Sequence, residues 1–259
     1  LSQSGVIAKS QREFSDKFGA KGCFFGVNGA SGLIQSAVIA MANPGENILM
    51  PRNVHISVIK ICAMQNINPI FFDLEFSTIT GHYKPITKIW LKNVFKKLNF
   101  DENKIAGVIL VYPSYHGYAG DLEPLIDCCH QKNLPVLVDE AHGSYFLFCE
   151  NLNLPKPALS TNADLVVNSL HKSLNGLTQT AVLWYKGNLI NEGNLIKSIN
   201  LLQTTSPSSL LLSSCEESIR DWLNKKSLSK YQKRILEAKS IYKKLIQKDI
   251  PLIETQDPL

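Results

Sequence analysis

The sequence has no run of apolar residues long enough to cross a membrane as a helix. Its longest apolar runs, such as residues 108–112, are far shorter than the roughly 20 residues that a bilayer requires. The first residues also lack a basic stretch followed by an apolar run, so no signal peptide is expected. These absences favour a protein of the cytoplasm that has no membrane partner.

The cysteine spacing typical of a metal centre or a redox motif is missing as well. The chain has six cysteines, none of them in a C-x-x-C pair, and most have apolar neighbours. They are Cys23, Cys62, Cys128, Cys129, Cys149 and Cys215. We expect reduced, buried thiols rather than disulfides or metal ligands, because cytosolic proteins rarely keep disulfides.

A general excess of positive charge, which would suggest nucleic-acid binding, is absent too. The net charge is +5, but residues 225–248 hold nine Lys or Arg residues and one Glu, so the rest of the chain is slightly acidic. Within that segment apolar residues recur every three or four positions, at Leu228, Tyr231, Ile235, Ala238, Tyr242 and Leu245. This spacing predicts a solvated helix with one apolar stripe and with its lysines on the face toward water, so no nucleic-acid partner is expected.

What the sequence does contain is an alternation of short apolar runs with helix-length segments. With 44% hydrophobic and 19% charged residues, the chain can bury a sizeable core. The apolar runs predict seven strands, at residues 23–27, 47–51, 69–73, 107–112, 135–139, 165–169 and 180–185. Helices are predicted at residues 31–42, 54–65, 85–98, 121–132, 191–202, 208–223 and 226–248. This pattern indicates an α/β fold with a mainly parallel sheet that has helices on both faces.

Residues that can react or bind a ligand lie where three of these strands end. In such sheets, ligands bind at the carboxyl ends of the strands. The stretch VDEAHGSYF places Asp139 at the end of one strand, and SLHKS places Lys172 just after another. A third strand leads into VNGASGL, where Gly29 and Gly32 leave room beside the start of a helix whose free N–H groups attract anions. Taken singly, each feature also fits an ordinary turn or an exposed lysine.

The combination of an anion site, a carboxylate and a lysine matches what pyridoxal phosphate (PLP) requires. The helix start would take the phosphate, Asp139 would keep the pyridine nitrogen protonated, and Lys172 would form the Schiff base. At roughly 4 Å and an effective dielectric constant near 20, the attraction between carboxylate and pyridinium is on the order of 4 kcal/mol before desolvation. We therefore interpret Asp139 as the partner of a cofactor ring nitrogen.

Several longer stretches resemble the fold-type I PLP-dependent enzymes, and more narrowly the ornithine/lysine/arginine decarboxylase family in its short form without an N-terminal wing domain. The most specific of them are RNVHISV, SLHKSLNGLTQTA and LLQTTSPSS, and they occur in the family's order together with VILVYPSYHGYAGDL and PVLVDEAHGSYF. The resemblance spans nearly the whole chain. It implies PLP as the cofactor and a basic amino acid as the substrate.

The resemblance also implies roles for residues around the cofactor ring. Lys172 would be the Schiff-base lysine, and Asp139 would bind the pyridine nitrogen. His55 would stack on the ring face opposite the substrate, while His142 and His171 would line the pocket near the ring and the substrate carboxylate. On sequence alone, an alternative for His171 is a purely structural role as a core residue beside Lys172.

A second group of residues would bind the cofactor phosphate. The resemblance assigns this role to Ala30, Ser31 and Gly32 through their backbone N–H groups and the Ser31 hydroxyl, with a further bond from Ser169. In the family the LLQTTSPSS loop reaches across a two-fold interface, so Thr205 would contact the phosphate of a neighbouring subunit, and a homodimer or higher oligomer is implied. The sequence by itself predicts only a helix end, a turn and a helix start there.

The domain division that we expect follows from the same family resemblance. Residues 1–20 would form a helical lead-in and residues 21–203 a large PLP-binding domain. Residues 204–259 would hold the interface loop and helices that lead to a truncated C-terminal domain, because the chain stops near where the family's small domain begins. Tyr145 stands where family members often have a second histidine, which would alter the substrate pocket.

The resulting prediction is a PLP-dependent decarboxylase of polyamine metabolism that converts lysine, arginine or ornithine to the amine and CO2. Two alternatives stay open at this stage. The same fold also supports aldolase, lyase and aminotransferase reactions, and an inactive PLP-binding partner subunit is consistent with the same sequence.

Overall fold

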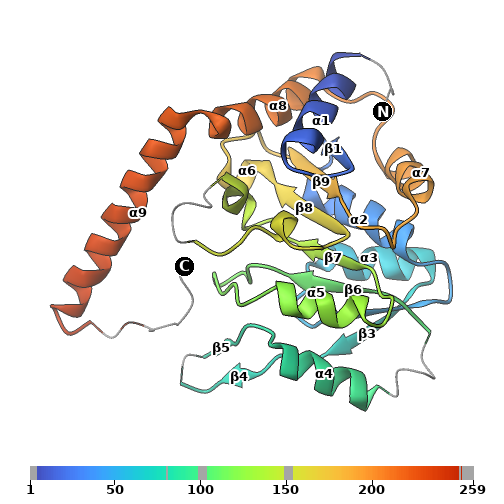
Figure 1. The fold of residues 1–259 in the computed structure, drawn as a ribbon, viewed down its shortest axis with the longest axis horizontal. Helices are drawn as coiled ribbons and strands as arrows, with labels where there is room; N and C mark the ends of the chain where they lie inside the picture. Colours follow the sequence, from blue (N-terminus) through green and yellow to red (C-terminus); the bar gives the residue numbers. More distant parts are fainter. Residues whose placement is uncertain (1–4, 80, 99–103, 149–153, 251, 253–259) are drawn as a thin grey trace.

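The computed structural model describes residues 5–79, 81–98, 104–148, 154–250 and 252, and its centre is a seven-stranded sheet (Figure 1). The strand order across the sheet is β1-β9-β8-β7-β6-β2-β3. These strands are β1 (Gly22–Gly26), β2 (Asn47–Pro51), β3 (Asn68–Phe72), β6 (Ile105–Val111), β7 (Val136–Asp139), β8 (Leu165–Ser169) and β9 (Ala181–Tyr185). Only β9 runs against its neighbours, β1 and β8, so the predicted mainly parallel α/β sheet is confirmed.

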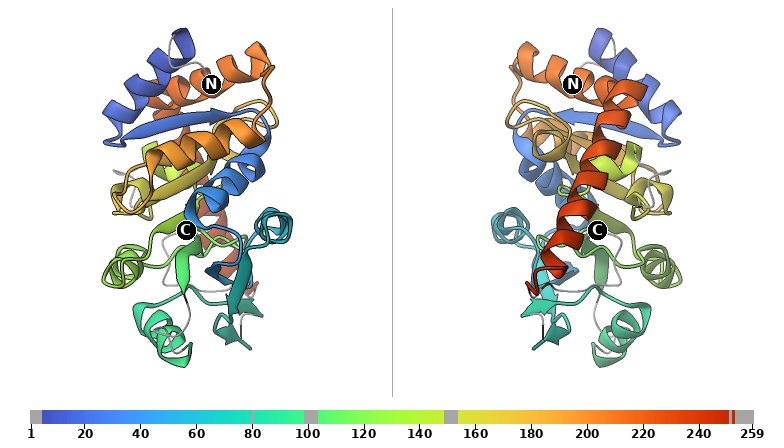
Figure 2. Two further views of the ribbon diagram at one scale, coloured as in Figure 1. Left: turned by 90° about the vertical axis from the view of Figure 1, so that its right-hand side faces the viewer. Right: turned by 90° about the vertical axis from the view of Figure 1, so that its left-hand side faces the viewer.

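Helices cover both faces of the sheet, as the sequence predicted (Figures 1 and 2). One face packs against α2 (Gly29–Met41), α3 (Ile56–Gln65) and α7 (Glu192–Leu202). The other face packs against α1 (Val6–Lys17), α4 (Lys88–Lys97), α5 (Glu123–His130) and α8 (Ser209–Leu223). The predicted helices and strands all occur, with ends that differ by up to three residues from the predicted ones, because helix and strand ends leave only a weak signal in sequence.

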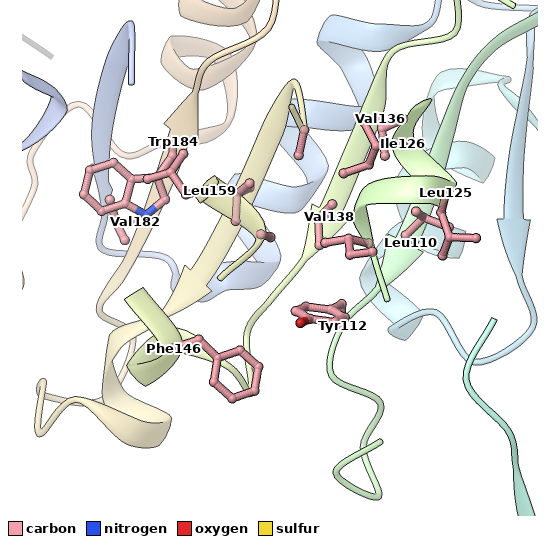
Figure 3. Packing of buried hydrophobic residues seen from close by; sticks show 14 of the residues in the cluster. Leu110, Tyr112, Leu125, Ile126, Val136, Val138, Phe146, Leu159, Val182 and Trp184 are labelled. Atoms are coloured by element: carbon pink, nitrogen blue, oxygen red, sulfur yellow. The ribbon is translucent and has the colours of Figure 1, made fainter. Parts of the chain in front are cut away.

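The sheet has a hydrophobic core on each face, and successive side chains of a central strand point alternately into one core and the other. In β7 the side chains of Val136 and Val138 join one core, where Ile126 of α5 also lies, and Leu137 between them joins the other. Figure 3 shows Val136 and Val138 beside Ile126 on the first of these faces. Successive side chains of a strand point to opposite faces, and each fully buried Val or Leu contributes about 1.5–3 kcal/mol. A strand that is apolar throughout is therefore held from both sides.

Several short elements were not predicted. They are the hairpin strands β4 (Phe76–Ser77) and β5 (His82–Tyr83), the 3-10 helices η1 (Ser144–Phe148) and η3 (Ala158–Ser160), and helix α6 (Leu170–Ser173). Elements of two to five residues are too short to show a periodic pattern of apolar residues. Their positions depend on packing against the sheet.

Helix α9 (Lys225–Ile246) forms as predicted, and Leu228 and Tyr231 at its start are partly buried against the core. The ring of Tyr231 packs 4.9 Å from Trp222 and 5.3 Å from Tyr145, measured between ring centroids. Further along the helix, Ala238 and Tyr242 are exposed. The reason is visible in Figure 1, where α9 leaves the sheet after its first turns.

The cysteines follow the prediction where the structure describes them. Cys23, Cys62, Cys128, Cys129 and Cys215 are free and buried, and Cys149 lies outside the described residues. Burial raises the pKa of the Cys215 thiol to about 12, so this group stays protonated at neutral pH. In the part of the chain that the structure describes, no helix combines the length and apolar character needed to span a bilayer.

Candidate active site

The predicted functional residues follow the carboxyl ends of neighbouring parallel strands. Strand β7 ends at Asp139 and pairs in parallel with β8. Strand β8 ends at Ser169, and the short helix α6 that follows it carries His171 and Lys172. Because parallel strands end at the same edge of the sheet, these side chains are delivered to one place.

Lys172 makes a direct contact with His142. Its Nζ atom lies 2.9 Å from His142 Nε2, so the lysine amine donates a hydrogen bond to the imidazole. Partial burial lowers the pKa of Lys172, and the nearby charge of Asp139 partly opposes this effect. Burial and the positive charges of Lys172 and His55 also lower the pKa of His142. A less basic lysine beside a neutral imidazole is suited to react as a nucleophile.

Asp139 is a buried carboxylate with little support from the protein. Its Oδ1 atom accepts a hydrogen bond from the Ala141 N–H at 3.1 Å. Burial raises the pKa of Asp139, while the Ala141 N–H and the charges of Lys172 and His55 act in the opposite direction. A cation placed against this carboxylate would favour its ionised form further, because opposite charges stabilise each other.

The neighbouring Glu140 is not part of the same group, although the two acids stand side by side in the sequence. Glu140 is fully buried, and its Oε1 atom accepts a hydrogen bond from the Ala158 N–H at 2.7 Å. Its Oε2 atom accepts another from Asn168 Nδ2 at 2.9 Å, and Asn168 Oδ1 accepts one from Trp184 Nε1 at 2.8 Å. Burial raises the pKa of Glu140 to about 8. This network joins β7, β8 and β9 inside the core.

His55 is held in a defined orientation at the start of α3. Its Nδ1 atom accepts a hydrogen bond from the Ser57 N–H at 3.2 Å and lies 2.8 Å from Ser57 Oγ. Because Nδ1 accepts, the neutral ring carries its proton on Nε2. The ring itself is exposed, and a positive charge on its protonated form lowers the pKa of both Asp139 and His142.

Ser169 and His171 contact each other behind Lys172. The Ser169 hydroxyl is completely buried and lies 3.2 Å from His171 Nδ1, which is also 3.3 Å from the Thr180 carbonyl oxygen. His171 is thus tied to β9 rather than to Lys172. The predicted bond from Ser169 to a phosphate remains a prediction, as does the role of His171 near the substrate.

The start of α2 has the properties of an anion site. Gly29 adopts a positive φ of 73°, a conformation that glycine accepts without strain. Its N–H donates a hydrogen bond to the Gln179 carbonyl at 2.8 Å. Within the described residues the N–H groups of Ala30 and Ser31 have no hydrogen-bond acceptor. Free N–H groups and the positive end of a 13-residue helix attract an anion.

Thr205 lies in the segment that follows α7. It is exposed on the loop between α7 and α8, where it lines a cavity of about 540 Å³ together with Val6, Val27 and Gln203. This position leaves the expected contact with a neighbouring subunit as a prediction.

Two residues of the site were missed by the sequence analysis. The exposed ring of Tyr115 meets the ring of His142 edge-on, with 5.4 Å between the ring centroids and an angle of 80°. Tyr115 follows the carboxyl end of β6, a signal that would have identified it. Ser57, which orients His55, gives no such signal, because its role depends on the conformation of the helix start.

The residues present fit pyridoxal phosphate. The buried carboxylate suits the protonated ring nitrogen, the lysine with a lowered pKa suits the aldehyde, and the free N–H groups at the start of α2 suit the phosphate. The fold is that of the fold-type I PLP-dependent enzymes. It is shared with a solved structure described as "SPT with PLP", with a TM-score of 0.69 at 17% identity over 97% of this chain and 59% of the other.

The chain belongs to the Orn/Lys/Arg decarboxylase family. The family described as "Orn/Lys/Arg decarboxylase, major domain" matches residues 1–258. Arginine decarboxylase of Bacillus cereus is 36% identical over 212 residues, which are 82% of this chain and 45% of the relative. Arginine decarboxylase of Bacillus subtilis is 34% identical over the same share of this chain and 42% of its own length. The chain thus spans less than half the length of these relatives.

Solved lysine decarboxylases share the fold. The enzyme of Francisella novicida gives a TM-score of 0.79 at 22% identity, with 98% of this chain and 36% of the other covered. Lysine decarboxylase A of Pseudomonas aeruginosa gives 0.80 at 20% identity, with 92% and 34% covered. Membership of this family indicates pyridoxal phosphate as the cofactor, as the sequence predicted.

Proposed function

We propose that the chain carries the cofactor-binding site of a PLP-dependent decarboxylase that acts on lysine, arginine or ornithine. The observation that supports this most strongly is the contact of Lys172 Nζ with His142 Nε2 at 2.9 Å, beside the buried carboxylate of Asp139. The arginine and lysine decarboxylases among its relatives support a basic amino acid as the substrate.

Each side chain would contribute a separate physical effect. When bound, pyridoxal phosphate supplies an electron sink for the electron pair that remains when CO2 leaves. Lys172 would hold the cofactor covalently through Nζ, and His142 Nε2 would accept the proton that Nζ must lose to react. Asp139 would hold a proton on the ring nitrogen by its negative charge. His55 would cover one ring face in the orientation that Ser57 imposes.

The test combines cofactor trapping with product detection. The protein is incubated with PLP, reduced with borohydride and digested, and the modified peptide is identified by mass spectrometry. Release of CO2 is then measured separately with lysine, arginine and ornithine. We expect the label on Lys172 and CO2 from one of the three substrates. A labelled protein that releases no CO2 from any of them would contradict decarboxylation and favour another fold-type I reaction or a non-catalytic subunit.

We further propose that the enzyme is a homodimer in which Thr205 contacts the phosphate in the partner's site. The exposed position of Thr205 on a loop supports this, because it leaves the hydroxyl accessible to a second chain. Sedimentation with detection of PLP absorbance should show the cofactor on the dimer, and Thr205→Val should weaken its binding while the exposed control Thr78→Val should not. PLP bound as tightly to a monomer would rule out a shared site.

The predicted compartment and domain division stand as part of the same proposal. The buried free thiols suit the reducing cytoplasm. Residues 1–20 would be a lead-in helix, residues 21–203 the cofactor-binding domain and residues 204–259 the interface loop and helices. Limited proteolysis would test the division, since cleavage should concentrate near the proposed boundaries.

A further inference from the structure

Gln203 has an amide nitrogen that is buried without a hydrogen-bond partner among the described residues. The residue directly follows helix α7, and its backbone N–H donates to the Ile199 carbonyl at 2.8 Å. A buried donor that makes no bond lowers stability, so nearly all such groups in folded proteins are satisfied. A buried amide nitrogen without a partner therefore points to an acceptor that binds beside it.

The Gln203 amide lies against the first turn of α2. A Cβ atom on Gly32 would come within 3.0 Å of Gln203 Nε2 and 3.1 Å of the Asn28 Cβ. Asn28 also donates from Nδ2 to the Leu202 carbonyl at 3.3 Å, which ties the end of α7 to the start of α2. The absence of a side chain at Gly32 thus makes room for the amide, and Asn28 keeps it there.

Donors without partners gather at this end of α2. The N–H groups of Ala30 and Ser31 have no acceptor within the described residues, and the Gln203 amide adds a third donor from a different helix. The first turn of α2 contains no acidic residue that would repel an anion. An acceptor with several oxygens and a negative charge, such as a phosphate group, matches this arrangement.

We propose that Gln203 Nε2 donates a hydrogen bond to the phosphate group held at the start of α2. This inference rests on the proposed function, in which that phosphate belongs to the cofactor. It assigns Gln203 to the binding site of its own chain, whereas Thr205, two residues further along the same loop, is proposed to act on the partner's site.

Two substitutions that preserve the length of the side chain test the proposal. Gln203→Met removes the donor, and Gln203→Glu replaces it by a carboxylate that repels phosphate. Binding of PLP and of pyridoxal, which lacks the phosphate, is followed by absorbance titration. PLP affinity should fall about 10- to 100-fold in Gln203→Met and further in Gln203→Glu. Pyridoxal affinity should stay within about two-fold of the wild type, because only the phosphate contact is lost.

The matched control is Gln131→Glu, which makes the same change at an exposed position after α5. This control should bind both compounds like the wild type. A second readout uses inorganic phosphate alone, which should raise the denaturation temperature of the wild type and of Gln131→Glu more than that of either Gln203 variant. The denaturation temperatures without ligand show that the variants are folded.

The outcomes separate this inference from the proposed function. Equal weakening of PLP and pyridoxal binding, or no change in PLP binding, would overturn the role of Gln203 even if borohydride still attaches PLP to Lys172. If no PLP attaches to Lys172, the proposed function fails instead. The response to inorganic phosphate then still decides whether Gln203 binds an anion.

Discussion

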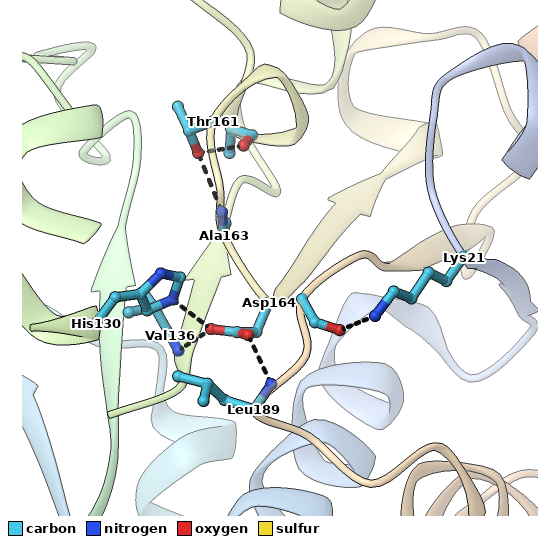
Figure 4. Close-up of polar contacts among 9 residues, drawn as sticks. Lys21, His130, Val136, Thr161, Ala163, Asp164 and Leu189 are labelled. Atoms are coloured by element: carbon cyan, nitrogen blue, oxygen red, sulfur yellow. Dashed lines mark hydrogen bonds and ion pairs between the residues drawn. The ribbon is translucent and has the colours of Figure 1, made fainter. Parts of the chain in front are cut away.

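Asp139 and Asp164 are buried carboxylates at opposite ends of the central strands, since Asp139 ends β7 and Asp164 precedes β8. They differ in how many hydrogen bonds the protein donates to them. Asp164 precedes β8 and is completely buried (Figure 4). Its Oδ2 atom accepts a hydrogen bond from the Val136 N–H at 2.9 Å and lies 2.8 Å from His130 Nε2, and its Oδ1 atom accepts one from the Leu189 N–H at 3.4 Å. Asp139 has the Ala141 N–H at 3.1 Å.

The surroundings of the two acids also differ in whether they leave space for a ligand. A Cβ atom on Gly187 would collide with Asp164, so the chain leaves no space there for another group. Asp139 instead faces the charges of Lys172 and His55 at the edge where parallel sheets bind ligands. The comparison teaches that burial alone does not mark a functional acid. A carboxylate whose acceptors are already used stabilises the fold, and one with remaining acceptors and a nearby lysine is available to a ligand.

The largest effect is expected from Lys172→Ala. The variant should lose all covalently bound PLP and all CO2 release, because Lys172 supplies the amine that contacts His142 in the proposed site. Trapping with borohydride followed by peptide mapping measures this. Lys186→Ala serves as a control at the opposite edge, where Lys186 Nζ donates to the Leu159 and Thr161 carbonyls, and it should keep the label on Lys172. A label on another lysine in Lys172→Ala would refute the assignment.

Asp139→Asn should be the next most damaging change to the reaction. The neutral amide cannot hold a proton on the ring nitrogen, so CO2 release should fall by about 100-fold or more. Borohydride should still attach PLP to Lys172, and the urea midpoint should change little. Turnover near the wild-type rate would show that the Asp139 carboxylate does not control the electron sink.

Glu140→Gln should change the dependence of stability on pH. Burial raises the pKa of Glu140 to about 8 from an ordinary value of 4.5, so the folded protein binds a proton that the unfolded chain has released. The contribution to stability is full below about pH 4.5 and is lost as the pH rises to about 8, with a slope of up to about 1.4 kcal/mol per pH unit. Urea unfolding at several pH values should show this fall in the wild type and a flatter profile in Glu140→Gln.

The smallest of these effects, and the one that sharpens the comparison of the two acids, is expected from Asp164→Asn. The substitution disturbs hydrogen bonds to a buried group, so the free energy of unfolding should fall by about 1–3 kcal/mol. Urea unfolding measures the loss, and PLP trapping on Lys172 should be unchanged. If Asp139→Asn destabilises the fold as much as Asp164→Asn does, the distinction between a structural and a ligand-binding acid does not hold.

Sequence patterns alone predicted much of the fold. Continuous apolar runs identified all seven strands of the main sheet, because a strand buried on both faces needs apolar residues at every position. The same patterns placed Asp139 at the end of one strand and Lys172 just after another, and hence at one edge of a parallel sheet. Local spacing also predicted α9. Periodicity shows that a helix has an apolar face and not what covers it, and in α9 only the first part of that face packs against the core, through Leu228 and Tyr231.

The tertiary structure decided the contacts between distant segments. Asp139 and Glu140 are adjacent and chemically alike, yet only packing determines that the charge of Lys172 acts on Asp139 while Glu140 accepts a hydrogen bond from Asn168. Gln203 and Gly32 lie far apart in the chain, and no local pattern links them, because their contact depends on how α7 packs against α2. Short-range order follows from propensity and periodicity, whereas the neighbours of a buried polar group follow from the complete fold.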